Sequence, residues 1–126
     1  MTRGRHFDSR EWLCQCARPD CDAPTIPDPA LVALCDTLRD AVDAPLGITS
    51  GLRCTFWNDH EHGEPQSGHL TGTEVDLACP TSRFRFRLLQ AIFSRNVTRV
   101  GIGKTFVHVG LSTTPLPQSV VWTYYP

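Results

Sequence analysis

Two histidines and one aspartate, placed in a fixed order, constrain this chain more than any other feature of its sequence. His69 precedes Gly72, which permits a tight turn, and Asp76 lies on an extended, apolar segment at residues 74–78. His108 lies further on, in a run rich in β-forming residues. Two imidazoles and a carboxylate form a ligand set that zinc accepts, with a fourth position left for water. A hairpin or a neighbouring strand would bring the three together, although spacing alone also allows ordinary surface or core histidines.

The residues around this ligand set follow a longer pattern. Residues 67–76 read Ser-x-His-x-x-Gly-x-x-x-Asp, and His108 belongs to a Phe-x-His strand. This order resembles the zinc D-alanyl-D-alanine carboxypeptidases, whose superfamily also holds phage endolysin L-alanyl-D-glutamate peptidases, vancomycin-resistance dipeptidases and the Hedgehog signalling domain. The likeness continues in Ser-Gly-Leu-Arg at residues 50–53, in the opening from Phe7 to Cys16, and in residues 99–103, so it spans nearly the whole chain.

The resemblance implies a role for each matching residue. His69, Asp76 and His108 would hold Zn²⁺. Arg53 would stabilise a substrate carboxylate or a developing oxyanion, for which its planar donor fork is suited, whereas without the resemblance it reads as a surface cation. Ser67 would contact substrate or support a metal ligand. Trp57, which stands where the family often has a histidine, would form an apolar wall of the substrate cleft.

The general base that peptide hydrolysis requires has no obvious candidate. Relatives place an acid three residues before the last histidine or two residues after it, and Thr105 and Gly110 stand at these positions. Glu74 stands where relatives usually have a small residue. Strand alternation predicts that Glu74 faces the same side as Asp76, where it would be the base or support the metal. If the strand bends at Thr73, Glu74 is instead a solvated rim residue.

Hydrophobic periodicity predicts an α+β fold with a single domain over residues 1–126. A capped start at Asp8 predicts a short helix that buries Trp12. Two main helices are expected, one of about four turns from Asp28-Pro29 and one over residues 80–96, both packed against a small, mainly antiparallel sheet. The resemblance implies that this fold is of Hedgehog/D,D-peptidase-like type. Residues 55–66 are polar and without periodicity, which predicts a loop.

The composition argues against several functions. A formal net charge of −1 with mixed signs gives no field for nucleic acid or an anionic membrane, so neither is expected as a partner. The alternating Arg83, Arg85 and Arg87 are interpreted as the solvated flank of a helix. No apolar run reaches membrane-spanning length, and no apolar leader opens the chain. We therefore expect a monomer that is cytoplasmic at synthesis and acts on the cell wall if a phage delivers it.

The six cysteines admit more than one interpretation. Cys14, Cys16 and Cys21 are close enough in sequence to suggest structural zinc. No Cys-x-x-Cys pair is present, however, so packing thiols or disulfide partners are the favoured interpretation. Cys54 and Cys79 flank segments of the predicted site, where a disulfide would fit. An even number of cysteines suits an oxidising compartment, and the absent leader argues against one.

The resemblance implies a zinc metallopeptidase of the D-alanyl-D-alanine carboxypeptidase or endolysin type. Its substrate would be a peptidoglycan stem peptide or another peptide that ends in D-Ala-D-Ala. The alternative is a catalytically silent zinc-binding recognition module, as in the Hedgehog branch, or a structural module of a phage particle. The empty acid positions at Thr105 and Gly110 keep that alternative open.

Overall fold

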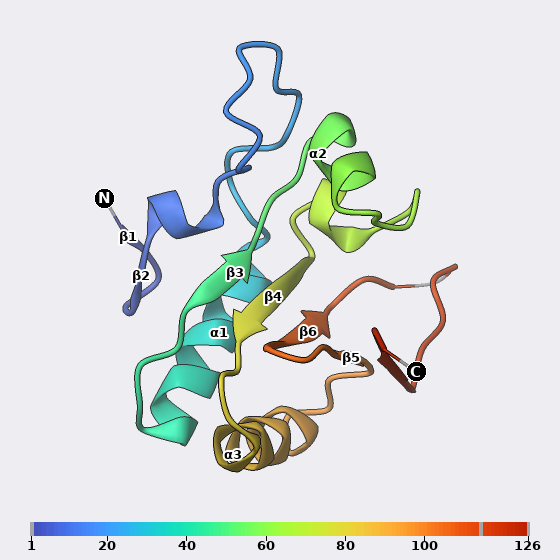
Figure 1. The fold of residues 1–126 in the computed structure, drawn as a ribbon. Coiled ribbons are helices and arrows are strands. Elements are labelled where there is room, and N and C mark those ends of the chain that lie inside the picture. The colour runs from blue at the N-terminus through green and yellow to red at the C-terminus, as the bar shows by residue number, and fades with distance from the viewer. Residues whose placement is uncertain (1, 114, 126) are drawn as a thin grey trace.

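A five-stranded sheet forms the centre of the computed structural model, which describes residues 2–113 and 115–125. The strand order is β3-β4-β6-β5-β7 (Figure 1). The strands are β3 (Ile48–Ser50), β4 (Glu74–Ala78), β5 (Arg99–Ile102), β6 (Phe106–Gly110) and β7 (Val120–Thr123). All neighbouring pairs are antiparallel except β5 and β7, which run parallel. The α+β class is confirmed, and the sheet is mainly antiparallel but mixed.

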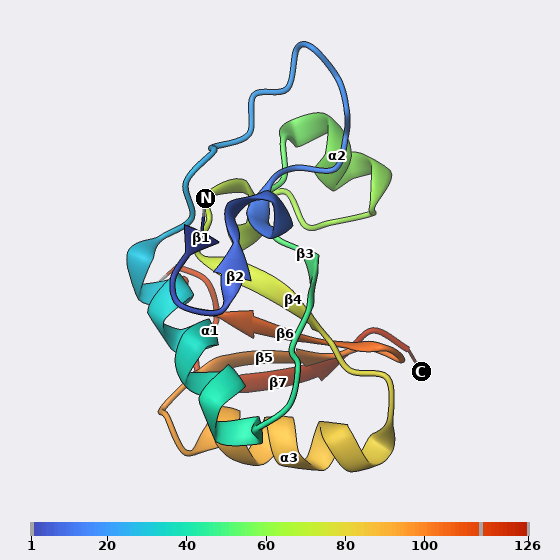
Figure 2. The ribbon, with the colours of Figure 1, turned by 90° about the vertical axis from the view of Figure 1, so that its left-hand side faces the viewer.

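The two main helices cover one face of this sheet (Figure 2). Helix α1 spans Pro29–Val42, and its N-cap Asp28 accepts a hydrogen bond from the N–H of Ala30 at 2.8 Å. Helix α3 spans Ser82–Phe93. It ends earlier than predicted, because a turn follows in which Asn96 has a φ of 57°, outside the helical range.

Strand alternation divides the sheet into a core face and a site face. Every second residue of β4 and β6 points toward the helices and packs into one buried cluster with them. The members of that cluster include Val75, Leu77, Val107 and Val109 from the sheet and Leu31, Leu38, Leu88 and Ile92 from the helices. The intervening residues of β4 and β6 must therefore project from the opposite face.

The N-terminal segment closes one end of the core. Strands β1 (Thr2–Arg3) and β2 (Phe7–Asp8) pair with each other, and a 3₁₀ helix, η1 (Ser9–Trp12), follows. Asp8 caps the N–H of Arg10, and Glu11 accepts from the N–H of Asp8 at 2.8 Å, which is the predicted capping box. Trp12 is 1% exposed.

The predicted loop over residues 55–66 is wrong in its first half. Thr55–His60 form a short helix, α2, and a second 3₁₀ turn, η2, spans Gly68–Leu70. The N-cap of α2 is Cys54, whose sulfur accepts the N–H of Trp57 at 3.3 Å. Cysteine is not one of the usual capping residues, so no residue before Thr55 marks the start of this helix in the sequence.

Candidate metal centre

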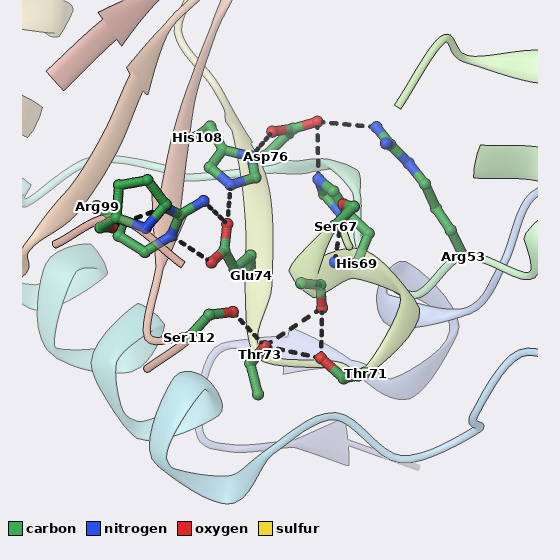
Figure 3. A network of polar contacts seen from close by, with 12 residues as sticks. Arg53, Ser67, His69, Thr71, Thr73, Glu74, Asp76, Arg99, His108 and Ser112 are labelled. Atoms are coloured by element: carbon green, nitrogen blue, oxygen red, sulfur yellow. Dashed lines mark hydrogen bonds and ion pairs between the residues drawn. The ribbon is translucent and has the colours of Figure 1, made fainter. Parts of the chain in front are cut away.

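The register of the sheet brings two of the predicted ligands together. Asp76 on β4 is the direct cross-strand partner of His108 on β6, and both side chains project from the site face (Figure 3). Nδ1 of His108 lies 2.8 Å from Oδ1 of Asp76. His69 comes from η2, whose N-cap Ser67 accepts the N–H of His69 at 3.2 Å. Nε2 of His69 lies 3.4 Å from Oδ2 of Asp76.

In each histidine, the ring nitrogen that points away from Asp76 forms a hydrogen bond that fixes the orientation of the ring. Nδ1 of His69 lies 2.7 Å from the carbonyl oxygen of Gly51, which can only accept, so this nitrogen carries the hydrogen. Nε2 of His108 lies 2.5 Å from Oε1 of Glu74 and donates in the same way. The remaining nitrogens, Nε2 of His69 and Nδ1 of His108, both face the carboxylate of Asp76, and each would offer its lone pair once a metal ion takes the place of the hydrogen between them. Fixing a metal-ligating imidazole through its other nitrogen is typical of zinc sites.

The three side chains fit a zinc ion. His69, Asp76 and His108 are 2%, 6% and 4% exposed, and each offers a ligand atom within 4.8 Å of the others. Burial opposes a charge on Asp76, but hydrogen bonds with His108 and His69 hold the pKa of its carboxyl well below its usual range. Two ring nitrogens and one carboxylate oxygen are therefore close enough to share one ion, and they are donor types that zinc prefers.

Glu74 lies beside this centre, as strand alternation predicted, and it is bound on both oxygens. Arg99 on β5 donates from Nε to Oε2 at 2.7 Å and from Nη2 to Oε1 at 3.4 Å. Burial opposes the charge of Glu74, but the hydrogen bonds from His108 and Arg99 lower the pKa of this carboxyl to about 2. A carboxylate with so low a pKa and both oxygens occupied is a poor proton acceptor at neutral pH.

Gly110 provides the space that Glu74 occupies. Gly110 lies on β6, the strand between β4 and β5, and it pairs with Glu74 on β4 and with Arg99 on β5. A Cβ atom at Gly110 would lie within 2.6 Å of Oε2 of Glu74. Gly110, one of the two positions at which the sequence suggested a base, has no side chain, and Glu74 from the facing strand occupies the space beside it. The geometry favours support of His108 over catalysis as the role of Glu74.

Arg53 lies on the other side of Asp76. Its Nη2 donates to Oδ2 of Asp76 at 3.3 Å, its Nε to Ser50 at 3.0 Å and its Nη1 to Asn58 at 3.3 Å. The side chain is 11% exposed and lines the cleft. A guanidinium has five N–H groups, so two remain for a substrate oxygen after these three bonds among the described residues. Arg53 is therefore a cleft residue and not a surface cation.

A cleft of about 1130 Å³ opens over the metal centre. Residues 61–67 form one wall, and Phe106, Trp122 and Tyr124 contribute aromatic rings to the other. The ring centroid of Trp122 lies 5.4 Å from that of His108, across Gly101, which has no side chain to separate them. Ser67 also lines this cleft, and its hydroxyl accepts the N–H of His69.

Trp57 is not among the residues that line the cleft. It stacks instead on His60 within α2, with ring centroids 4.7 Å apart. The helical conformation of residues 55–60 turns this side chain away, so the structure does not bring it to the other predicted site residues. The apolar wall expected from Trp57 is supplied by Trp122, which only the pairing of β7 with β5 places near His108.

Among the described residues, no helix has the length and apolar character needed to cross a membrane.

The fold and the ligand set define a peptidase-like domain with a candidate metal site. The family model described as Peptidase M15 matches residues 5–110, and the chain belongs to that family. No curated protein matches the chain.

Proposed function

We propose that the protein is a zinc-dependent peptidase that hydrolyses peptidoglycan stem peptides ending in D-Ala-D-Ala. The observation that carries this proposal is the convergence of His69, Asp76 and His108 at the floor of a cleft that also presents Arg53. Zinc, when bound, supplies Lewis-acid chemistry to the peptide carbonyl and to the attacking water. Family membership supports peptide hydrolysis, and the cleft supports a peptide-sized substrate.

The side chains of the cleft position a peptide by charge and shape. The two free N–H groups of Arg53 match the two oxygens of a terminal carboxylate, which a carboxypeptidase substrate must present. Ser50 and Asn58 hold the guanidinium in place, so little side-chain entropy is lost on binding. The rings of Trp122 and Tyr124 supply an apolar wall that excludes water from the opposite side.

A peptide that ends in D-Ala-D-Ala tests this proposal. Zinc-loaded protein is expected to release free D-alanine, measured by mass spectrometry, and a chelator should stop the release until zinc is returned. The same peptide with a C-terminal amide should be cleaved more slowly, because it lacks the carboxylate that Arg53 would bind. Release that persists in His108→Ala, or equal rates for acid and amide, would contradict the proposal.

A silent zinc-binding module remains the second candidate, because one observation favours it. Both oxygens of Glu74 are occupied by His108 and Arg99, which removes the nearest carboxylate as a general base. In that case the protein would bind the D-Ala-D-Ala peptide in a zinc-dependent manner and release no amino acid. Calorimetric titration beside the hydrolysis assay distinguishes the two functions.

Replacing Arg53 by lysine is expected to lower kcat/KM by about a hundredfold, because lysine keeps the charge but not the paired donors. Zinc content and thermal stability should stay close to those of the parent. Arg10→Lys is the matched control, since the Arg10 side chain is 85% exposed and pairs with Asp8. Unchanged kcat and KM in Arg53→Lys would mean that Arg53 does not contact substrate.

A further inference from the structure

Four cysteines outside the candidate metal centre converge at one place. Cys14, Cys16 and Cys21 come from the loop at residues 13–28, and Cys54 directly precedes α2. All four are free thiols, and their sulfur atoms lie within 4.8 Å of one another. Figures 1 and 2 both show this loop beside α2. The structure also leaves Cys35 and Cys79 free, so it contains neither the disulfide considered at Cys54 and Cys79 nor one within the group of Cys14, Cys16 and Cys21.

The separation of the sulfur atoms is close to that of a metal site. Four thiolates around zinc, each at about 2.3 Å, lie about 3.8 Å from one another in a tetrahedron. A disulfide joins its two sulfur atoms at about 2 Å and would divide the cluster into pairs. The observed upper limit of 4.8 Å is about 1 Å longer than this separation, so a small contraction would bring the four sulfur atoms to bonding distance of one ion.

Backbone N–H groups point at the sulfur atoms. Three of the four accept such a bond: Cys14 from Cys54 at 3.3 Å, Cys16 from Arg18 at 3.4 Å and Cys54 from Trp57 at 3.3 Å. A left-handed φ of 55° at Ala17 forms the turn that directs one of these N–H groups back to its sulfur. Hydrogen bonds to sulfur favour the thiolate, which is the form that binds metal.

We propose that Cys14, Cys16, Cys21 and Cys54 bind a structural zinc ion. Soft thiolate ligands in a tetrahedral S₄ arrangement select zinc or iron, and zinc binds such sites without redox chemistry. Four protein ligands leave no open position, so this metal would stabilise the fold and take no part in hydrolysis. The site is independent of the proposed peptidase function, because it shares no ligand with His69, Asp76 and His108.

The proposed zinc would order a long connection and fix the cleft arginine. Residues 13–28, all within the described part of the chain, form neither helix nor strand. Contacts with α2 dock this loop: Asp22 accepts the N–H of Thr55 at 3.2 Å, and Arg18 stacks 4.0 Å above the Phe56 ring. Cys54 follows Arg53 directly, so a metal bound there anchors the backbone that carries the guanidinium into the cleft.

Zinc analysis of the full chain, purified under reducing conditions without chelator, tests this proposal. We expect two zinc ions per chain in the parent and one in Cys21→Ser. Cys35→Ala is the matched control and should keep two, because Cys35 is a buried thiol outside the cluster. His108→Ala should keep one, which separates failure at this site from failure at the metal centre.

Cobalt substitution gives a second readout, and its arms in the parent and in His108→Ala do not depend on any cysteine variant folding. Thiolate-to-cobalt charge-transfer absorption is expected in the parent and in His108→Ala, and it should disappear in Cys21→Ser. One zinc ion in the parent, an unchanged count in Cys21→Ser, or a protein mass lowered by disulfide formation would overturn the proposal. Iron in place of zinc would overturn the choice of metal.

Discussion

His108→Ala is expected to bind one zinc ion fewer per chain than the parent and to lose hydrolysis to the background rate. The substitution removes a ligand nitrogen and leaves Asp76 and Glu74 facing each other without the imidazole between them. Two buried carboxylates repel each other, so without the imidazole Asp76 is less stable in the position from which it would bind zinc. Elemental analysis and the D-alanine release assay measure the two effects.

His60→Ala is the matched control for His108→Ala. His60 is a histidine that stacks on Trp57 and does not line the cleft, so its removal should change neither zinc content nor rate. Circular dichroism should show that both variants fold. Full zinc content in a folded His108→Ala would remove His108 from the ligand set.

The second large effect is expected when the carboxyl group beside His108 is moved from Glu74 on β4 to position 110 on β6. Gly110→Asp alone should weaken zinc binding by about 10- to 100-fold, because the new side chain collides with Glu74 and displaces it from His108. Glu74→Ala alone should do the same and also destabilise the fold by about 3–5 kcal/mol, because Arg99 is left buried without its partner. The double variant Glu74→Ala/Gly110→Asp restores an acid to this space from β6.

The double variant should therefore lose less zinc affinity and less stability than the losses of the two single variants added together. Zinc competition against a chromophoric chelator and thermal unfolding of all four proteins form the double-mutant cycle. Additive losses would show that Glu74 and Gly110 do not share one function. Glu74→Gln separates support from catalysis: a supporting residue loses zinc affinity, whereas a base would keep zinc and lose rate.

The sequence was sufficient where the signal is local. The ligand motif predicted which side chains converge, and alternation along β4 placed Glu74 and Asp76 on one face. Helix α1 was predictable because a cap, a proline and a regular apolar stripe occur together at its start. These features depend on neighbours within a few residues.

What the sequence did not reveal depends on pairing between distant segments. The ion pair of Glu74 with Arg99 requires β4 and β5 to flank β6 with Gly110 between them, and no local pattern reports that register. Trp122 likewise reaches the cleft only through the parallel pairing of β7. Cys54 lies far along the chain from the other cysteines of its cluster, so spacing alone could not show that the four thiols come together.

Anomalous diffraction at the zinc edge, from crystals of the zinc-loaded protein, tests the central claim most directly. We expect an anomalous peak within bonding distance of Nε2 of His69, a carboxylate oxygen of Asp76 and Nδ1 of His108, with Nε2 of His108 still donating to Glu74. A peak on Nε2 of His108 with Glu74 as a ligand, or no peak between these three residues at full zinc occupancy in solution, would contradict it.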